Sequence, residues 1–187
     1  MKKALAIAGI LALSIAPTAS SASHLEPKEI EIRDGGNLFH TNLKARNLSG
    51  ANLSGAFLRG AELGEANLSG ANLGSSNLTG ANLFRAELSN ANLSGAFLRG
   101  AELGEANLSG AFLLDADLYA AVLYRAELSN ANLTGVNLTG AILMRSDLSG
   151  ANLSNAKLSG IIATDLRGCP RSLPKGWVCE NKSLIQR

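Results

Sequence analysis

The clearest pattern in the chain is an apolar residue that recurs with a period of five. Leucine occupies every fifth position from Leu38 to Leu158, and a small residue, nearly always alanine, stands two positions before each leucine. This period fits neither the stripe of an amphipathic helix nor a flat strand, whose side chains alternate between two faces. The pattern therefore predicts a chain that bends once per repeat and winds into a solenoid, with leucine and alanine inside.

The polar positions of each repeat agree with such a bend. The residue before the leucine is most often asparagine, and glycine is common two positions after it, as at Gly50, Gly55 and Gly60. Glycine adopts backbone angles that other residues avoid, so we expect the corner of each bend at this position.

The repeats ANLSG, AELGE, AFLRG, ANLTG and AKLSG resemble the A-(D/N)-L-x-x motif of the pentapeptide-repeat proteins over about two thirds of the chain. This resemblance implies an all-β fold, a right-handed quadrilateral β-helix with four pentapeptides in each coil. Residues twenty apart would then stack in columns, about 4.8 Å from one another, as in neighbouring strands.

One such column carries charges of alternating sign. It contains Glu65, Arg85, Glu105 and Arg125, which we expect to form a ladder of exposed ion pairs along one corner of the coil. Each exposed pair contributes less than ~1 kcal/mol, so the ladder would define the register of the coils more than their stability.

The same side of the coil carries the predicted partner surface. In the later coils, apolar residues stack as Val122 on Ile142 and Tyr124 on Met144, with Phe84 further along. Outward apolar columns are uncommon on a soluble monomer and indicate a contact. The contact could be a protein partner whose identity the sequence does not give, a second copy of the chain, or the C-terminal tail folded back. A homodimer through a rod end is a further alternative.

Two other surface patterns carry weaker hypotheses. Phe57 and Phe97 point outward beside arginines, but the identical segments 51–71 and 91–111 account for them by duplication. A column of serines could match a repetitive ligand such as a glycan or ice, although serine is also the usual residue after the central leucine: Ser49, Ser69, Ser89, Ser109, Ser129 and Ser149.

The two ends lie outside the repeat. Residues 1–23 combine two lysines, an apolar run and small residues, which is typical of a cleaved secretory signal peptide. An uncleaved anchor is the alternative, and no other segment predicts a membrane span. We expect export to the periplasm or, in a cyanobacterium, to the thylakoid lumen.

Short caps are expected on both sides of the predicted β-helix at 36–160. Residues 24–35 form the N-terminal cap or linker and 161–187 the C-terminal cap. Cys169 and Cys179 are the only cysteines, and in an exported chain they predict a disulfide within the second cap.

The sequence predicts no enzyme. The two histidines, His24 and His40, lie near the unrepeated start, and the glycines keep the period of five without forming a phosphate-binding loop. Carboxylates recur with the duplication, whereas an active site is needed once. We therefore expect no catalytic residue, no cofactor and no metal site.

The charge of the chain argues against nucleic acid. The net charge is +2, and acidic and basic residues nearly balance within the repeats. A basic stripe would be needed to bind DNA, and a strongly negative rod to mimic it, as some pentapeptide-repeat proteins do when they bind type II topoisomerases. The sequence instead favours an exported, non-catalytic scaffold or protein-interaction module.

Overall fold

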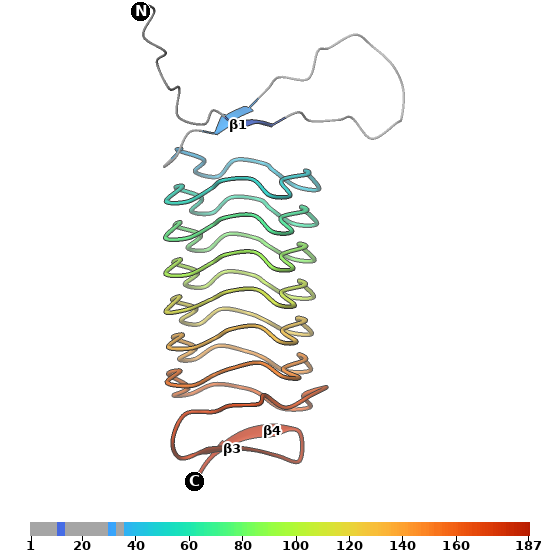
Figure 1. Cartoon of the computed structure of the whole chain (residues 1–187), viewed down its shortest axis with the longest axis vertical. Coiled ribbons are helices and arrows are strands. Elements are labelled where there is room, and N and C mark those ends of the chain that lie inside the picture. Colours follow the sequence, from blue (N-terminus) through green and yellow to red (C-terminus); the bar gives the residue numbers. More distant parts are fainter. Residues whose placement is uncertain (1–10, 14–29, 33–35) are drawn as a thin grey trace, which may run out of the picture.

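The computed structural model describes residues 11–13, 30–32 and 36–187. From residue 36 onward, the chain forms a stack of coils that ends in a C-terminal hairpin (Figure 1). Parallel bridges join each coil to the next between residues twenty apart, from Asn37 with Phe57 to Ile142 with Ile162. Four pentapeptides therefore make one coil, as the resemblance implied.

Each side of a coil is one pentapeptide that ends in a tight turn. The amide of the small inward residue donates to the carbonyl of the preceding leucine, as Ala51 N does to Leu48 O at 3.0 Å. Gly50, at the third position of this turn, has φ of +67°, and Ser49 before it has no positive φ. These features define a type II turn, which explains why glycine recurs two positions after leucine.

Hydrogen bonds between coils replace the long ladder of an ordinary sheet. Leu53 N donates to Asn72 O at 2.7 Å, and Asn72 N donates to Ala51 O at 2.9 Å. Each side has one such bridging residue, the one before the leucine, because the turn follows immediately. Each side is therefore joined to its neighbours by isolated bridges, and extended strands occur only near the two ends of the described chain.

The inward leucines and alanines fill the interior, as the period of five predicts. Every central leucine from Leu43 to Leu153 is at most 1% exposed. Two serines replace alanine inside the rod, Ser76 and Ser146, and both are fully buried. Because a coil buries its leucines against the coils above and below, the core is continuous along the rod.

The coils continue beyond Gly160, where the pattern of leucines stops. Ile161 occupies the small inward position and Ala163, 3% exposed, the position of the missing leucine. One extra residue then enters the coil, so that Asp147 pairs with Gly168, and the last parallel bridge joins Asn152 to Ser172. Because large and small residues exchange places, the same two positions still point inward although the leucine motif is lost.

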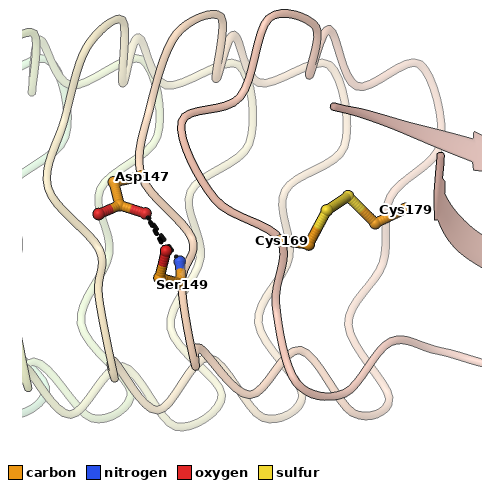
Figure 2. The surroundings of a disulfide bond; sticks show 4 residues. All are labelled: Asp147, Ser149, Cys169 and Cys179. Carbon is orange, nitrogen blue, oxygen red and sulfur yellow. Dashed lines mark hydrogen bonds between the residues drawn. A yellow bond between two sulfur atoms is a disulfide. The ribbon is translucent and has the colours of Figure 1, made fainter. Parts of the chain in front are cut away.

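A disulfide-bonded hairpin closes the C-terminal end. Strands β3 (Trp177–Glu180) and β4 (Ser183–Gln186) pair antiparallel below the last coil (Figure 1). Leu184 is buried and its amide donates to Ala163 O at 3.0 Å, which attaches β4 to the coil. The predicted disulfide joins Cys169 of the last coil to Cys179 of β3 (Figure 2).

Two short strands lie at the other end. Strand β1 (Leu11–Leu13) pairs antiparallel with β2 (Ile30–Ile32). The rest of the predicted signal peptide at 1–23 and of the N-terminal cap at 24–35 lies outside the described residues. Within the described ranges, the chain forms no helix with the length and hydropathy of a membrane span.

Candidate interaction surface

The predicted partner surface lies on one of the four sides of the rod. We call this side the apolar face, and it consists of the stacked pentapeptides 41–45, 61–65, 81–85, 101–105, 121–125, 141–145 and 161–165. Two outward columns run along it, one from the residues before each central position and one from the residues after it. The first column is polar at its N-terminal end and apolar in the last three coils, whereas the second alternates glycine with Phe84 and Tyr124, continues with Met144 and ends in Thr164.

The first column forms a continuous apolar strip. Val122 pairs with Ile142, and Ile142 pairs with Ile162 in the next coil. Val122 and Ile142 are half-buried because each is flanked by the residues stacked on either side, whereas Ile162 is 46% exposed. Sequence reasoning missed Ile162 because the leucine pattern ends before it, although its position twenty residues after Ile142 places it in the same column.

The second column adds aromatic and thioether side chains. Tyr124 and Met144 are half-buried and lie in successive coils. Phe84 is 39% exposed, and its ring covers Gly104, since a Cβ added to that glycine would lie 3.3 Å from Phe84 Cδ2. Gly104 thus leaves the space in which Phe84 extends towards Tyr124, and the structure brings the five predicted residues onto one face.

The C-terminal hairpin does not fold back along this face. Strands β3 and β4 lie at the end of the rod (Figure 1), where Leu184 and Trp177 pack against the core. Of the alternatives left by the sequence, the tail is therefore not the cover of Val122 and Ile142.

A charged edge borders the apolar face. We give this name to the column at its turns, made of Ala45, Glu65, Arg85, Glu105, Arg125, Arg145 and Asp165. Arg85 Nε lies 2.8 Å from Glu105, and Arg125 Nη1 lies 3.7 Å from the same carboxylate. Glu65 lies one coil from Arg85 but pairs with Lys44 at 3.4 Å, so the alternating ladder joins three of its four predicted members.

The arginines of the charged edge also lie over the aromatic rings of the apolar face. The guanidinium carbon of Arg85 is 4.8 Å from the centroid of Phe84, and that of Arg125 is 5.1 Å from the centroid of Tyr124. Cation–π contacts of this kind contribute about 0.5–1 kcal/mol at exposed sites. The edge and the face thus form one surface, apolar in the middle and bordered on one side by charges of both signs.

The charged edge lacks the residue that its turns favour. All seven of its members have φ between 54° and 60°, and none is glycine, whereas each of the other three edges contains several glycines. A left-handed conformation costs a non-glycine residue roughly 1 kcal/mol or more. The non-glycine residues of this edge therefore occupy it at some expense of stability.

The serine column is less available for a ligand than its sequence suggests. Ser69 donates from Oγ to Asn67 Oδ1 at 2.7 Å, and Ser149 donates to Asp147 Oδ1 at 2.6 Å (Figure 2). Ser129 donates to Ser109 Oγ at 3.1 Å, and four of the six serines are half-buried. These hydroxyl groups have partners within the rod, so the glycan or ice hypothesis stays a prediction without structural support.

The part of the chain that the structure describes holds no cluster of three or more histidine, cysteine, aspartate or glutamate side chains that could bind a metal ion. Large exposed apolar side chains also lie on other sides of the rod, as at Phe97 and Phe112, but on the apolar face one column is apolar through three consecutive coils.

Comparisons with known proteins identify relatives of the rod. A family model described as pentapeptide repeats matches in eight copies, over residues 47–83, 86–123 and 121–160. A pentapeptide repeat protein from the thylakoid lumen of Arabidopsis thaliana is similar in structure, with TM-score 0.51 and 34% identity over 51% of this chain and 67% of its own. No curated protein sequence matches significantly.

Cyanobacterial structures are also similar in sequence. A pentapeptide repeat protein from Nostoc PCC 7120 is 39% identical over 54% of this chain and 83% of its own, with TM-score 0.36. HetL of the same organism, a protein involved in heterocyst differentiation regulation, is 27% identical over 82% of this chain and 92% of its own, with TM-score 0.32.

Proposed function

Because the chain belongs to the pentapeptide-repeat family, whose β-helix presents long flat faces, we propose that it is an exported, non-catalytic scaffold that binds a protein partner through its apolar face. The observation that carries this proposal is the strip of Val122, Ile142 and Ile162 in consecutive coils, with Tyr124 and Met144 beside it. A contiguous strip buries more apolar area against one partner than isolated side chains do.

The rigidity of the rod supports binding. Ile142 is bonded to the preceding coil, where its N donates to Ala121 O at 3.0 Å and its O accepts from Leu123 N at 2.7 Å. The residues on either side of it bond to the next coil, through Ala141 O and Leu143 N to Ile162 at 2.9 and 2.7 Å. A surface fixed in this way loses little conformational entropy when a partner docks, so more of the apolar burial appears as affinity.

The partner that fits this surface presents apolar side chains next to acidic ones. The apolar residues would cover the strip, and the acidic residues would face Arg125 and Arg145 of the charged edge. Complementary charge of this kind fixes the orientation of a partner and raises its association rate.

Export is part of the proposal. The Cys169–Cys179 disulfide is typical of proteins that fold in an oxidising compartment. The signal-like residues 1–23 and the lumenal origin of the similar Arabidopsis protein support the same assignment. The periplasm and the thylakoid lumen are both compatible with these features.

The test is capture from the exported fraction followed by reconstitution with the purified partner. We expect Val122→Lys with Tyr124→Lys to weaken binding at least tenfold, and Phe112→Lys to leave it unchanged. Phe112 is a matched control because it occupies the same pentapeptide position on the opposite side of the rod and is 51% exposed. Equal binding by all three proteins would exclude the apolar face as the docking site.

Sedimentation of the free protein tests the competing occupant. The proposal expects a monomer whose mass does not change in the double lysine variant. A dimer that dissociates in that variant would assign the apolar face to self-association and overturn the proposed function.

A further inference from the structure

A pocket lined by three arginines opens beside the apolar face. It has a volume of about 400 Å³, and its lining consists of Arg125, Arg145, Asp165 and Arg167. Arg125, Arg145 and Asp165 are consecutive members of the charged edge, and Arg167 follows just after the last turn of that edge. We call this hollow the corner pocket. The proposed function places Arg125 and Arg145 opposite acidic residues of a partner, and the inference here deepens that function by naming the group that they bind; acetate and short peptides test it without the partner.

Arg167 is held in place by the coils that it crosses. Its Nη1 lies 2.6 Å from Glu127 Oε1, its Nε donates to Arg145 O at 3.0 Å, and its Nη2 lies 3.4 Å from the carbonyls of Arg125 and Ala126. Most of its N–H groups are therefore engaged. Arg167 contributes positive charge to the corner pocket and forms part of its wall.

Arg145 has the most free donors in the pocket. Its Nη1 lies 3.4 Å from the hydroxyl of Tyr124, a long contact, and within the described residues no carboxylate lies within ion-pair distance of it. Arg125 lies 3.7 Å from Glu105, which is nearer to Arg85, and it is half exposed. Both guanidinium groups can therefore turn N–H donors towards a bound anion.

The charge balance of the corner pocket limits the negative charge that a bound anion can carry. Glu127 neutralises much of the charge of Arg167, and Asp165 places one carboxylate in the lining. What remains is about one unpaired positive charge, carried mainly by Arg145. A polyphosphate or nucleic-acid backbone would bring more negative charge than the pocket can compensate, and Asp165 would repel it.

We propose that the corner pocket binds a single carboxylate group, with Arg145 as its principal donor and Arg125 as its second. The planar fork of a guanidinium matches the two oxygens of a carboxylate, and three arginines around one hollow strengthen the potential there. The carboxylate can belong to a small organic acid or to an acidic residue of a peptide, and both present the same group to the arginines.

The probes are sodium acetate, titrated against sodium chloride at constant ionic strength, and two peptides, acetyl-Val-Asp-Val-amide and acetyl-Val-Asn-Val-amide. The arginine Nε–Hε signals of the full exported chain are followed by NMR. We expect a saturable shift of the Arg145 signal with acetate and none with chloride. The aspartate peptide shifts the same signal, and the asparagine peptide does not.

Three variants separate a binding site from a general effect of charge. Followed through the Arg125 signal, Arg145→Gln should weaken acetate binding roughly threefold, the scale of one exposed charge pair, and Asp165→Asn should strengthen it by a similar factor. Asparagine tolerates the left-handed backbone at that position, so the second variant should fold. Lys157→Gln removes one positive charge from another, exposed side of the rod and should have no effect.

The outcomes decide between the sources of the carboxylate. Tighter binding of the aspartate peptide than of acetate supports a peptide ligand, and equal binding supports a small organic acid. A shift without saturation, or equal weakening by Lys157→Gln and Arg145→Gln, would overturn the proposal, since either result would reflect only the net charge of the rod.

Discussion

Ser146 donates a hydrogen bond from its buried hydroxyl group to the carbonyl oxygen of Leu143, 2.8 Å away. Ser76 occupies the same inward position of another repeat, but its hydroxyl is buried without a hydrogen-bond partner in the described structure. The two serines therefore differ in energy although the repeat pattern makes them equivalent.

This difference predicts that Ser76→Ala stabilises the rod. Alanine is the ordinary residue at this position, and an unsatisfied buried hydroxyl costs roughly 1–3 kcal/mol. We expect the free energy of unfolding in urea to rise by about 1 kcal/mol. Ser146→Ala is the matched control and should gain less, because it also removes a hydrogen bond. Equal gains in the two variants would contradict the assignment.

The continuity of the core predicts a strong effect of a charge inside it. Leu93 is fully buried in the middle of the rod. Leu93→Ala should lower the free energy of unfolding by about 2–5 kcal/mol, and Leu93→Asp should abolish cooperative unfolding, because an isolated interior carboxylate has no partner. Circular dichroism melts measure both.

The adjacent outward position supplies the control for that experiment. Asn92→Asp adds the same carboxylate one residue away, on the surface, where Asn92 is only half-buried. Because it also removes the hydrogen bond that Asn92 Nδ2 donates to Asn72 Oδ1 at 3.1 Å, it should lower the free energy of unfolding by about 1 kcal/mol and keep the cooperative transition. A Leu93→Asp protein that melts like wild type would show that the interior is not the closed core described above.

The turns predict a cost for removing glycine that is purely conformational. Gly80 has φ of +63°, and a Cβ added there would meet nothing within 4 Å. Gly80→Ala should therefore destabilise by about 1 kcal/mol, through the left-handed backbone alone. Gly80→Asn should cost less, because asparagine visits this conformation more readily. Identical losses in urea denaturation would exclude this explanation.

The sequence predicts the parts of the structure that repeat. A leucine every five residues requires an inward position on every side of the coil, and two cysteines in an exported chain leave one pairing. The continuation of the coil beyond Gly160 could not be predicted from leucines, because Ile161 and Ala163 exchange the large and small positions. Together these two side chains fill the interior as a leucine and an alanine do, so only their summed volume indicates that the coil continues.

Long side chains limited the prediction of the charged edge. The spacing of twenty places Glu65 beside Arg85, but its long side chain can adopt several rotamers, and it pairs with Lys44 on the same side of the rod. Arg167 crosses two coils to reach Glu127, forty residues earlier in the sequence, a contact that no local pattern contains. This contact holds Arg167 in the lining of the corner pocket. The sequence therefore predicted the charged column but not the pocket beside it.

The disulfide predicts that the C-terminal hairpin can open separately from the central coils when the bond is reduced. Cys169 and Cys179 are ten positions apart in the sequence, and a loop of that size contributes up to ~3 kcal/mol by restricting the unfolded chain. Because the bond joins the last coil to β3, reduction should loosen the β3–β4 hairpin before it affects the central coils. Amide hydrogen exchange under reducing conditions should therefore accelerate at Val178 and Leu184 while Leu93 remains protected.

The variant Cys169→Ala with Cys179→Ala should reproduce the effect without a reductant, which separates loss of the bond from chemical side effects. Uniform acceleration along the whole rod would mean that the cap and the coils unfold as one unit, and would contradict a cap that is stabilised locally.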